Sequence, residues 1–184
     1  MKTLKLLFGC FAVVALAQLA VPAWMIVSHE QTLAAGEVFK FHTAPVDPYD
    51  AFRGRYVRLQ IDQNSLPMPA GVEWKRGQKV FALIETGTNG FARLTELRAT
   101  PPVDKPYLAV RVSYISGQTA WLDVPLDRFY MEESLAPAAE KAYREHSRVA
   151  QHDAYITVRI RDGSPVIENL WIDGTPIRDF LARK

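Results

Sequence analysis

The N-terminal segment carries the feature that most constrains this chain, an uncharged apolar run from Leu6 to Val27. Gln18 and Pro22 interrupt the run without adding charge. A helix rises about 1.5 Å per residue and needs roughly 20 apolar residues to cross the core of a bilayer, and this run has about 22. The run therefore predicts a membrane-spanning helix.

The charges that flank the run predict its orientation. Lys2 and Lys5 precede it, and Glu30 follows it. Basic flanks stay on the cytoplasmic side of a membrane. We therefore expect residues 1–28 to form a cytoplasmic start and a single-pass anchor in the bacterial inner membrane, and residues 29–184 to form a periplasmic domain. A cleaved signal peptide is the main alternative, and a buried core helix is a more remote one.

The exported part of the chain is electrically balanced. The whole chain has 22 Lys and Arg against 20 Asp and Glu, and without Lys2 and Lys5 the 22 basic residues become 20. Binding to nucleic acid through its phosphates needs a basic excess, so the composition argues against a nucleic-acid partner. Cys10 lies inside the apolar run and is the only cysteine. Disulfides, thiolate zinc sites and thiol catalysis are therefore excluded from the exported domain.

Beyond the anchor, the hydrophobic pattern is mostly that of β-strands. Residues 55–62 alternate, with Val57, Leu59 and Ile61 on one face. Gly-containing turns join several of the predicted strands, as in hairpins. The other strands are expected at residues 37–41, 78–85, 91–98, 108–115, 121–124, 155–161 and 166–172. The pattern predicts a mainly β (α+β) fold, with an antiparallel β-rich domain after the transmembrane helix.

One helix is predicted to pack on this domain. Ser134 is a suitable N-cap, and apolar residues recur at helical spacing from Leu135 to Val149. Two Pro-rich stretches, residues 66–70 and 99–106, are predicted loops. The second of them marks a candidate sub-boundary of the domain at residues 100–106.

Charged and aromatic residues are concentrated in one stretch, APVDPYDAFRGRYVRLQI. In a structural interpretation, Asp47 and Asp50 form turns, and Arg53 pairs with a carboxylate. Gly54 would allow a positive φ or a close backbone approach before the strand begins at Arg55. In a functional interpretation, the stretch is a recognition loop that presents guanidinium and carboxylate groups to a ligand or partner. The spacing alone favours the structural interpretation.

This stretch resembles the motif of the GDYXXLXY family of bacterial membrane-anchored proteins. The matching positions are Ala44, Pro45, Val46, Asp47, Pro48, Asp50, Phe52, Arg53, Gly54, Tyr56, Val57 and Leu59. A second match is the aromatic and acidic stretch from Arg128 to Glu133, followed by a helix with Glu140. The third is the C-terminal hairpin from Val158 to Pro176. With the N-terminal anchor, the resemblance covers nearly the whole chain.

Two positions depart from the family motif. Arg55 stands where the motif has Asp, and Ile61 stands where it has its final Tyr. Chemistry that depends on the motif Asp is therefore unavailable to this chain, and Ile61 favours a packing role. The resemblance implies topology and fold more than chemistry. It also implies a partner, because family members tend to be encoded beside, or fused to, multi-spanning membrane proteins.

The sequence favours a non-enzymatic function. Its four histidines have no metal-binding spacing, and it lacks the GxSxG and SxxK motifs of serine enzymes. No catalytic residue, metal site or cofactor is predicted. We expect an accessory protein that docks a polytopic membrane protein or another envelope component. The alternative is a cell-envelope hydrolase or sugar-binding domain that uses Asp47, Asp50, Arg53 and Glu132.

The two motifs are expected to meet in space and to form one docking or ligand surface. Arg53 should lie within hydrogen-bonding distance of Glu132, Glu133 or Asp50. Loops beside strands are where binding residues gather. The complete predicted surface comprises Asp47, Asp50, Arg53, Gly54, Arg55, Tyr56, Arg128, Glu132 and Glu133.

Overall fold

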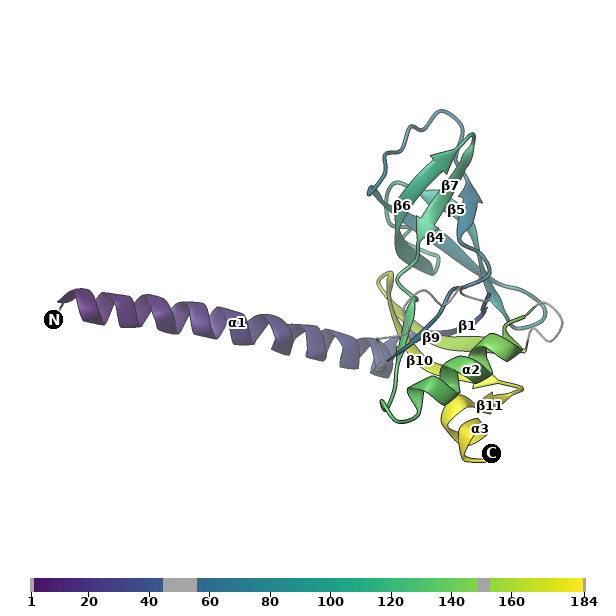
Figure 1. The fold of residues 1–184 in the computed structure, drawn as a ribbon. Coiled ribbons are helices and arrows are strands. Elements are labelled where there is room, and N and C mark those ends of the chain that lie inside the picture. Colours follow the sequence, from purple (N-terminus) through teal and green to yellow (C-terminus); the bar gives the residue numbers. More distant parts are fainter. Residues whose placement is uncertain (1, 45–55, 149–152, 184) are drawn as a thin grey trace.

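The fold, seen in a computed structural model, is a long N-terminal helix followed by a β-rich domain (Figure 1). The structure describes residues 2–44, 56–148 and 153–183, and side chains from residue 7 onward. In the described part of the chain, the helices are α1 (Lys2–Ala35), α2 (Ala136–His146) and α3 (Ile177–Ala182). The strands are β1 (Glu37–His42), β2 (Tyr56–Arg58), β3 (Ser65–Pro67), β4 (Lys79–Thr86), β5 (Ala92–Arg98), β6 (Tyr107–Ser116), β7 (Thr119–Asp123), β8 (Arg128–Tyr130), β9 (Ala154–Arg161), β10 (Ser164–Ile172) and β11 (Thr175–Pro176).

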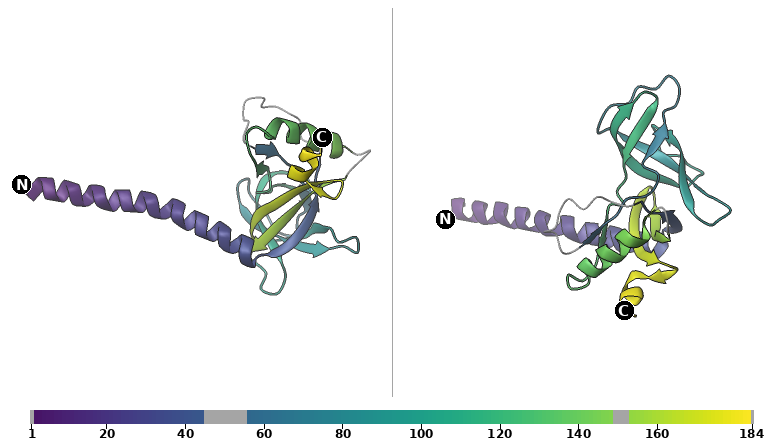
Figure 2. Two further views of the ribbon diagram at one scale, coloured as in Figure 1. Left: turned by 90° about the horizontal axis from the view of Figure 1, so that it is seen from below. Right: turned by 45° about the vertical axis from the view of Figure 1, so that its right-hand side comes forward.

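Helix α1 projects as a rod from the β-rich domain in all three views (Figures 1 and 2). Its segment Leu7–Ala35 is long and apolar enough to span a membrane. Leu7 and Trp24 are 67% and 72% exposed, and the most apolar window of the helix has no buried residue. The interpretation as a buried core helix is therefore wrong. The helix continues past the apolar run to Ala35.

The domain contains two main antiparallel sheets, which lie one above the other in Figure 1. The five-stranded sheet has the order β3-β7-β6-β4-β5. The four-stranded sheet has the order β1-β9-β10-β11, and α2 and α3 lie below it in Figure 1. A separate two-stranded ribbon pairs β2 with β8. The predicted β-rich, antiparallel architecture is confirmed.

One hydrophobic core joins both sheets. Val80, Leu94 and Leu108 of the five-stranded sheet and Ile156 and Leu170 of the four-stranded sheet belong to the same buried cluster. The turn between β9 and β10 packs on β6, because the backbone N–H of Ala109 donates to the carbonyl of Gly163 at 2.9 Å. The apolar side chains of the alternating strands therefore face one shared interior.

Several predicted elements differ in detail from the observed ones. In the described part of the strand predicted at residues 55–62, only Tyr56–Arg58 form a strand, because Leu59 then bonds to Asp127 and Ile61 forms an isolated bridge with Thr43. The predicted loop at residues 66–70 contributes to the edge strand β3, a position that tolerates Pro67. Helix α2 has Leu135 as its N-cap, with no side-chain cap bond, so Ser134 is not the cap. The sequence analysis did not predict α3.

Candidate functional site

The two family motifs meet where β2 pairs with β8 (the motif ribbon). Tyr56 lies opposite Tyr130, and their ring centroids are 5.7 Å apart. The guanidinium carbon of Arg128 lies 5.5 Å from the centroid of the Tyr56 ring, at the distance of a cation–π contact. Hydrogen bonding to Tyr130, followed by the charge of Asp127, raises the pKa of Arg128. Two residues of the predicted surface, Tyr56 and Arg128, are thus neighbours.

The acidic residues of the second motif follow the ribbon directly. Glu132 and Glu133 are exposed in the segment between β8 and α2. The carbonyl of Glu132 accepts the backbone N–H groups of Leu135 and Ala136 at 3.0 and 3.1 Å, so this residue supports the start of the helix through its backbone. The remaining predicted surface residues, Asp47, Asp50, Arg53, Gly54 and Arg55, lie outside the described residues, and the contact predicted for Arg53 lies there with them.

Backbone contacts join the two ends of the first motif, residues 43–44 and 60–61 (the base of the motif). The N–H of Ala44 donates to the carbonyl of Gln60 at 2.8 Å, and Thr43 forms a bridge with Ile61. Ile61 is 3% exposed and belongs to the core. The packing role expected at this departure from the motif is confirmed. The base therefore brings the two ends of the first motif together just after β1 ends.

Tyr143 on α2 holds this base from the side of the helix. Its hydroxyl donates to the carbonyl of Ala44 at 2.7 Å and accepts the N–H of Gln60 at 3.5 Å. Burial raises the pKa of Tyr143 to about 12. The sequence analysis missed this residue. An aromatic hydroxyl on the apolar face of an amphipathic helix was the available signal, since a buried tyrosine hydroxyl needs a partner.

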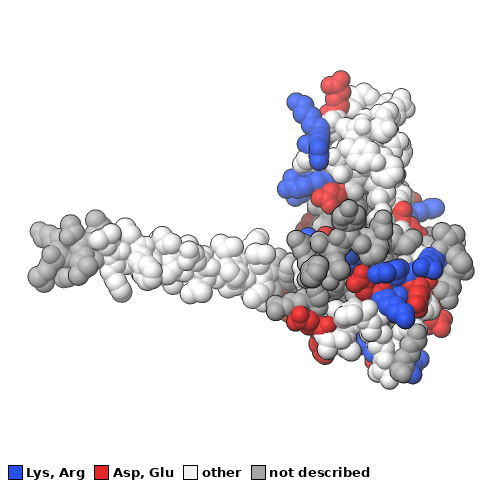
Figure 3. Space-filling view, viewed as in Figure 1, with Lys and Arg blue, Asp and Glu red and all other residues white. Residues whose placement is uncertain are grey.

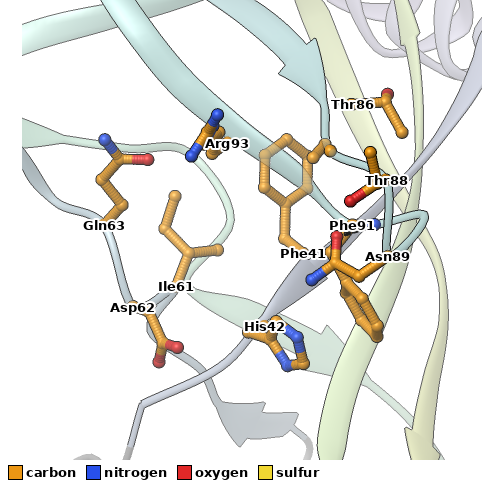
Figure 4. Close-up of a pocket in the computed structure, with 12 residues that line it drawn as sticks. Phe41, His42, Ile61, Asp62, Gln63, Thr86, Thr88, Asn89, Phe91 and Arg93 are labelled. Carbon is orange, nitrogen blue, oxygen red and sulfur yellow. Dashed lines mark hydrogen bonds between the residues drawn. The ribbon is translucent and has the colours of Figure 1, made fainter.

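A groove of about 630 Å³ opens beside the base (Figure 4). Its side chains converge from the end of β1, from residues 61–63 and from the β4–β5 hairpin. The ring of His42 stacks on Phe91 with 3.6 Å between centroids, and Phe91 meets Tyr155 edge to face. Gln63 bonds to both backbone groups of Leu94, at 2.5 and 2.8 Å. The described lining does not include Glu132.

The described residues include His, Cys, Asp and Glu side chains, and His146 and Asp153 among them form a pair. They contain no group of three or more His, Cys, Asp or Glu side chains that could hold a metal ion. The half-buried pair of His146 and Asp153, with 2.9 Å from Nδ1 to a carboxylate oxygen, connects the end of α2 to the start of β9. Phe180 of α3 packs edge to face on the same imidazole. This pair joins α2, α3 and the four-stranded sheet.

One comparison with known proteins identifies a family for this chain. A family model described as GDYXXLXY protein matches residues 18–170, which include the end of the apolar run, the motif ribbon and most of the β9–β10 hairpin. No curated protein and no solved structure matches the chain. Since the family match covers most of the chain, the protein belongs to the GDYXXLXY family.

Proposed function

We propose that this protein is a single-pass accessory protein of the bacterial inner membrane whose periplasmic domain docks a polytopic membrane protein. The observation that carries the proposal is the absence of a linker between the apolar helix and the domain. Helix α1 ends at Ala35, and β1 begins at Glu37. A domain attached in this way keeps one orientation relative to α1, so only the tilt and rotation of α1 change its orientation relative to the bilayer.

Hydrogen bonds make this junction stiff. The N–H of Gly36 donates to the carbonyl of Thr32 at 2.8 Å, and the carbonyl of Gly36 accepts Arg159 Nη1 at 3.4 Å. Arg161 Nη1 donates to the side chain of Gln31 at 3.3 Å. A Cβ on Gly36 would collide with the Thr32 carbonyl. The end of α1 is therefore locked onto β9, and little orientational entropy remains for a membrane partner to remove.

The composition of the motif ribbon suits a protein partner. Tyr130 is 64% exposed and lies beside Tyr56 and Arg128. Tyr and Arg are the residue types enriched in the parts of interfaces that carry most of the binding energy.

The basic flank of α1 supports the orientation, because Lys2 and Lys5 favour a cytoplasmic N-terminus and hence a periplasmic domain. The family implies the class of partner, a multi-spanning protein.

A tagged full-length chain, purified from gently solubilised native membranes, tests the docking surface. We expect a polytopic membrane protein to co-purify with the wild type and to be lost from the double variant Tyr130→Ser/Arg128→Ser. Tyr114→Ser is the matched control, since Tyr114 is also exposed, at 49%, and also packs on an aromatic ring. Equal recovery with the double variant, or recovery of no multi-spanning protein, would refute the proposal.

The groove supports a second candidate function, the binding of a cell-envelope sugar. Its volume lies in the usual range for small-molecule sites, and it combines aromatic rings with the polar side chains of Asn89 and Arg93. Titration of the full chain with soluble cell-wall fragments tests this candidate. Binding that Asn89→Ala weakens and that Tyr130→Ser leaves unchanged would favour a sugar site over docking.

A further inference from the structure

We propose that a group of basic side chains on the five-stranded sheet (the basic edge) rests on the anionic phospholipid headgroups of the leaflet from which α1 emerges. The basic edge comprises Lys75 and Arg76 in the turn before β4, Lys79 at the start of β4 and Arg111 on the neighbouring strand β6. Arg161 lies beyond it on the β9–β10 hairpin. The proposal depends on α1 lying in the bilayer, as the proposed function also does, and it is independent of any protein partner.

Backbone and side-chain bonds hold the members of the basic edge together. Lys79 lies opposite Arg111 across the β4–β6 ladder, and Arg111 Nη1 donates to the carbonyl of Gly77 at 3.0 Å. The turn that carries Lys75 and Arg76 is closed by a bond from the Gln78 N–H to the Lys75 carbonyl at 3.0 Å. The N–H of Gly77 then ties this turn to β6 through the Val112 carbonyl, at 2.7 Å.

A chain of contacts connects the basic edge to the end of α1. Gln31 of α1 bonds to Arg161 at the end of β9, and the adjacent Gly163 accepts a hydrogen bond from Ala109 on β6. Arg111 stands two residues further along the same strand. The space-filling view shows Lys and Arg side chains along the edge of the upper lobe on the side toward which α1 extends (Figure 3). A membrane that holds α1 lies on this side.

The height of the junction above the bilayer matches the headgroup layer. From Val27, where the apolar run ends, to Ala35, the helix rises about 12 Å. The headgroup layer is roughly 5–7 Å thick on each side of the hydrocarbon core. Arg161, which bonds to Gln31 near the end of α1, therefore stands within about 8 Å of the headgroups, which is the Debye length at physiological salt. Attraction to anionic lipids acts over this distance.

The basic edge itself has an excess of basic groups. Asp123 lies opposite Arg111 and Glu73 precedes the turn, whereas Asp162, Glu30 and Glu37 lie at the junction beside Arg161. Within the described residues, no ion pair involves Lys75, Arg76 or Lys79. The exported part of the chain has no overall basic excess, so the gathering of cations on the membrane-facing side is a local feature. Each Lys or Arg near an anionic surface strengthens binding about five-fold.

Energy transfer in nanodiscs tests the contact with the full-length chain. In a Cys10→Ser background, Val72→Cys carries a donor dye beside the basic edge, and labelled headgroups carry the acceptor. Thr88→Cys, at the tip of the β4–β5 hairpin, is the control position. We expect transfer from position 72 to be higher in phosphatidylglycerol discs than in phosphatidylcholine discs and to fall at high salt. Position 88 should show no lipid dependence.

Charge reversal supplies the decisive comparison. Lys75→Glu/Arg76→Glu should lower the equilibrium constant for the lipid-bound orientation about 25-fold or more and abolish the difference between the two lipids. An unchanged melting temperature establishes that this variant is folded. Equal transfer from position 72 in both lipids, or an unchanged lipid dependence in the variant, overturns the proposal. A chain that does not elute with the discs overturns the anchoring as well, and this outcome differs from a failure of the basic edge alone.

Discussion

The two main sheets of the domain differ in how the chain supplies their strands. Every strand of the five-stranded sheet comes from residues 65–123, and its long pairs are hairpins or near neighbours. The four-stranded sheet instead pairs β1 with β9, with Glu37 opposite Ile160. The first sheet is local in sequence, whereas the second closes only when the two ends of the domain meet.

Because of this difference, some parts of the molecule depend on local pairing and others on pairing between distant segments. The anchor, the base of the first motif and α2 all attach to the four-stranded sheet. The basic edge belongs to the local sheet. Long-range pairing must first overcome the entropy of closing a long loop. The family motifs are thus built on the region whose structure depends on the whole chain.

The sharpest test of the comparison asks whether the two sheets unfold together. Ile156 of β9 is fully buried in the common core, and Ile156→Ala should destabilise the domain by about 2–5 kcal/mol because it leaves a cavity. Amide hydrogen exchange should then accelerate in β4 and β6 as well as in β1 and β9. Protection of β4 and β6 that remains at the wild-type level would show two independent units.

Leu94→Ala is the reciprocal variant in the local sheet. Leu94 is 1% exposed and belongs to the same core. A single cooperative transition predicts a loss of the same size, about 2–5 kcal/mol, and faster exchange in β9.

The contact between the sheets is tested by adding one methyl group. Gly163 has a φ of 74°, and a Cβ there would collide with the Tyr107 ring. Gly163→Ala should destabilise the domain by about 1–3 kcal/mol through overpacking, in addition to the backbone strain. Gly90→Ala is the matched control, since Gly90 has a φ of 78° and no atom within 4 Å of its Cβ position. Equal losses of stability for the two variants in thermal denaturation would show that Gly163 is not tightly packed against Tyr107.

A smaller effect is expected at the base of the first motif. Tyr143→Phe removes the bond to the Ala44 carbonyl and should cost about 1 kcal/mol at neutral pH. The pH dependence of stability tests whether the Tyr143 hydroxyl makes this contribution. Because the pKa is about 12 in the folded chain and near 10 when unfolded, the folded state holds the proton more tightly. This stabilisation is complete below pH 10 and is lost as the pH rises through 12.

Chemical denaturation of the wild type and Tyr143→Phe at pH 8 and at pH 11 measures this contribution. The gap in stability between the two proteins should be smaller at pH 11. A gap that stays constant would mean that the Tyr143 hydroxyl does not hold the base.

The accuracy of the sequence-based predictions follows the same division between local and long-range structure. The β4–β5, β6–β7 and β9–β10 hairpins were predictable, because alternating residues flank Gly-containing turns. The helix start was placed one residue early, at Ser134, because a good capping residue does not form a cap unless its side chain reaches the backbone. The role of Tyr143 was not predictable in detail, since its partners, Ala44 and Gln60, are distant in sequence.

The sequence by itself determined the apolar helix, the family and the antiparallel β-rich class, because hydrophobic length, motif spacing and strand alternation are properties of neighbouring residues. Only the tertiary structure decided that β2 pairs with β8, that α2 holds the base of the first motif, and that α1 passes into β1 without a linker. These features depend on pairing and packing between distant segments. Their energies arise only when the whole chain has folded.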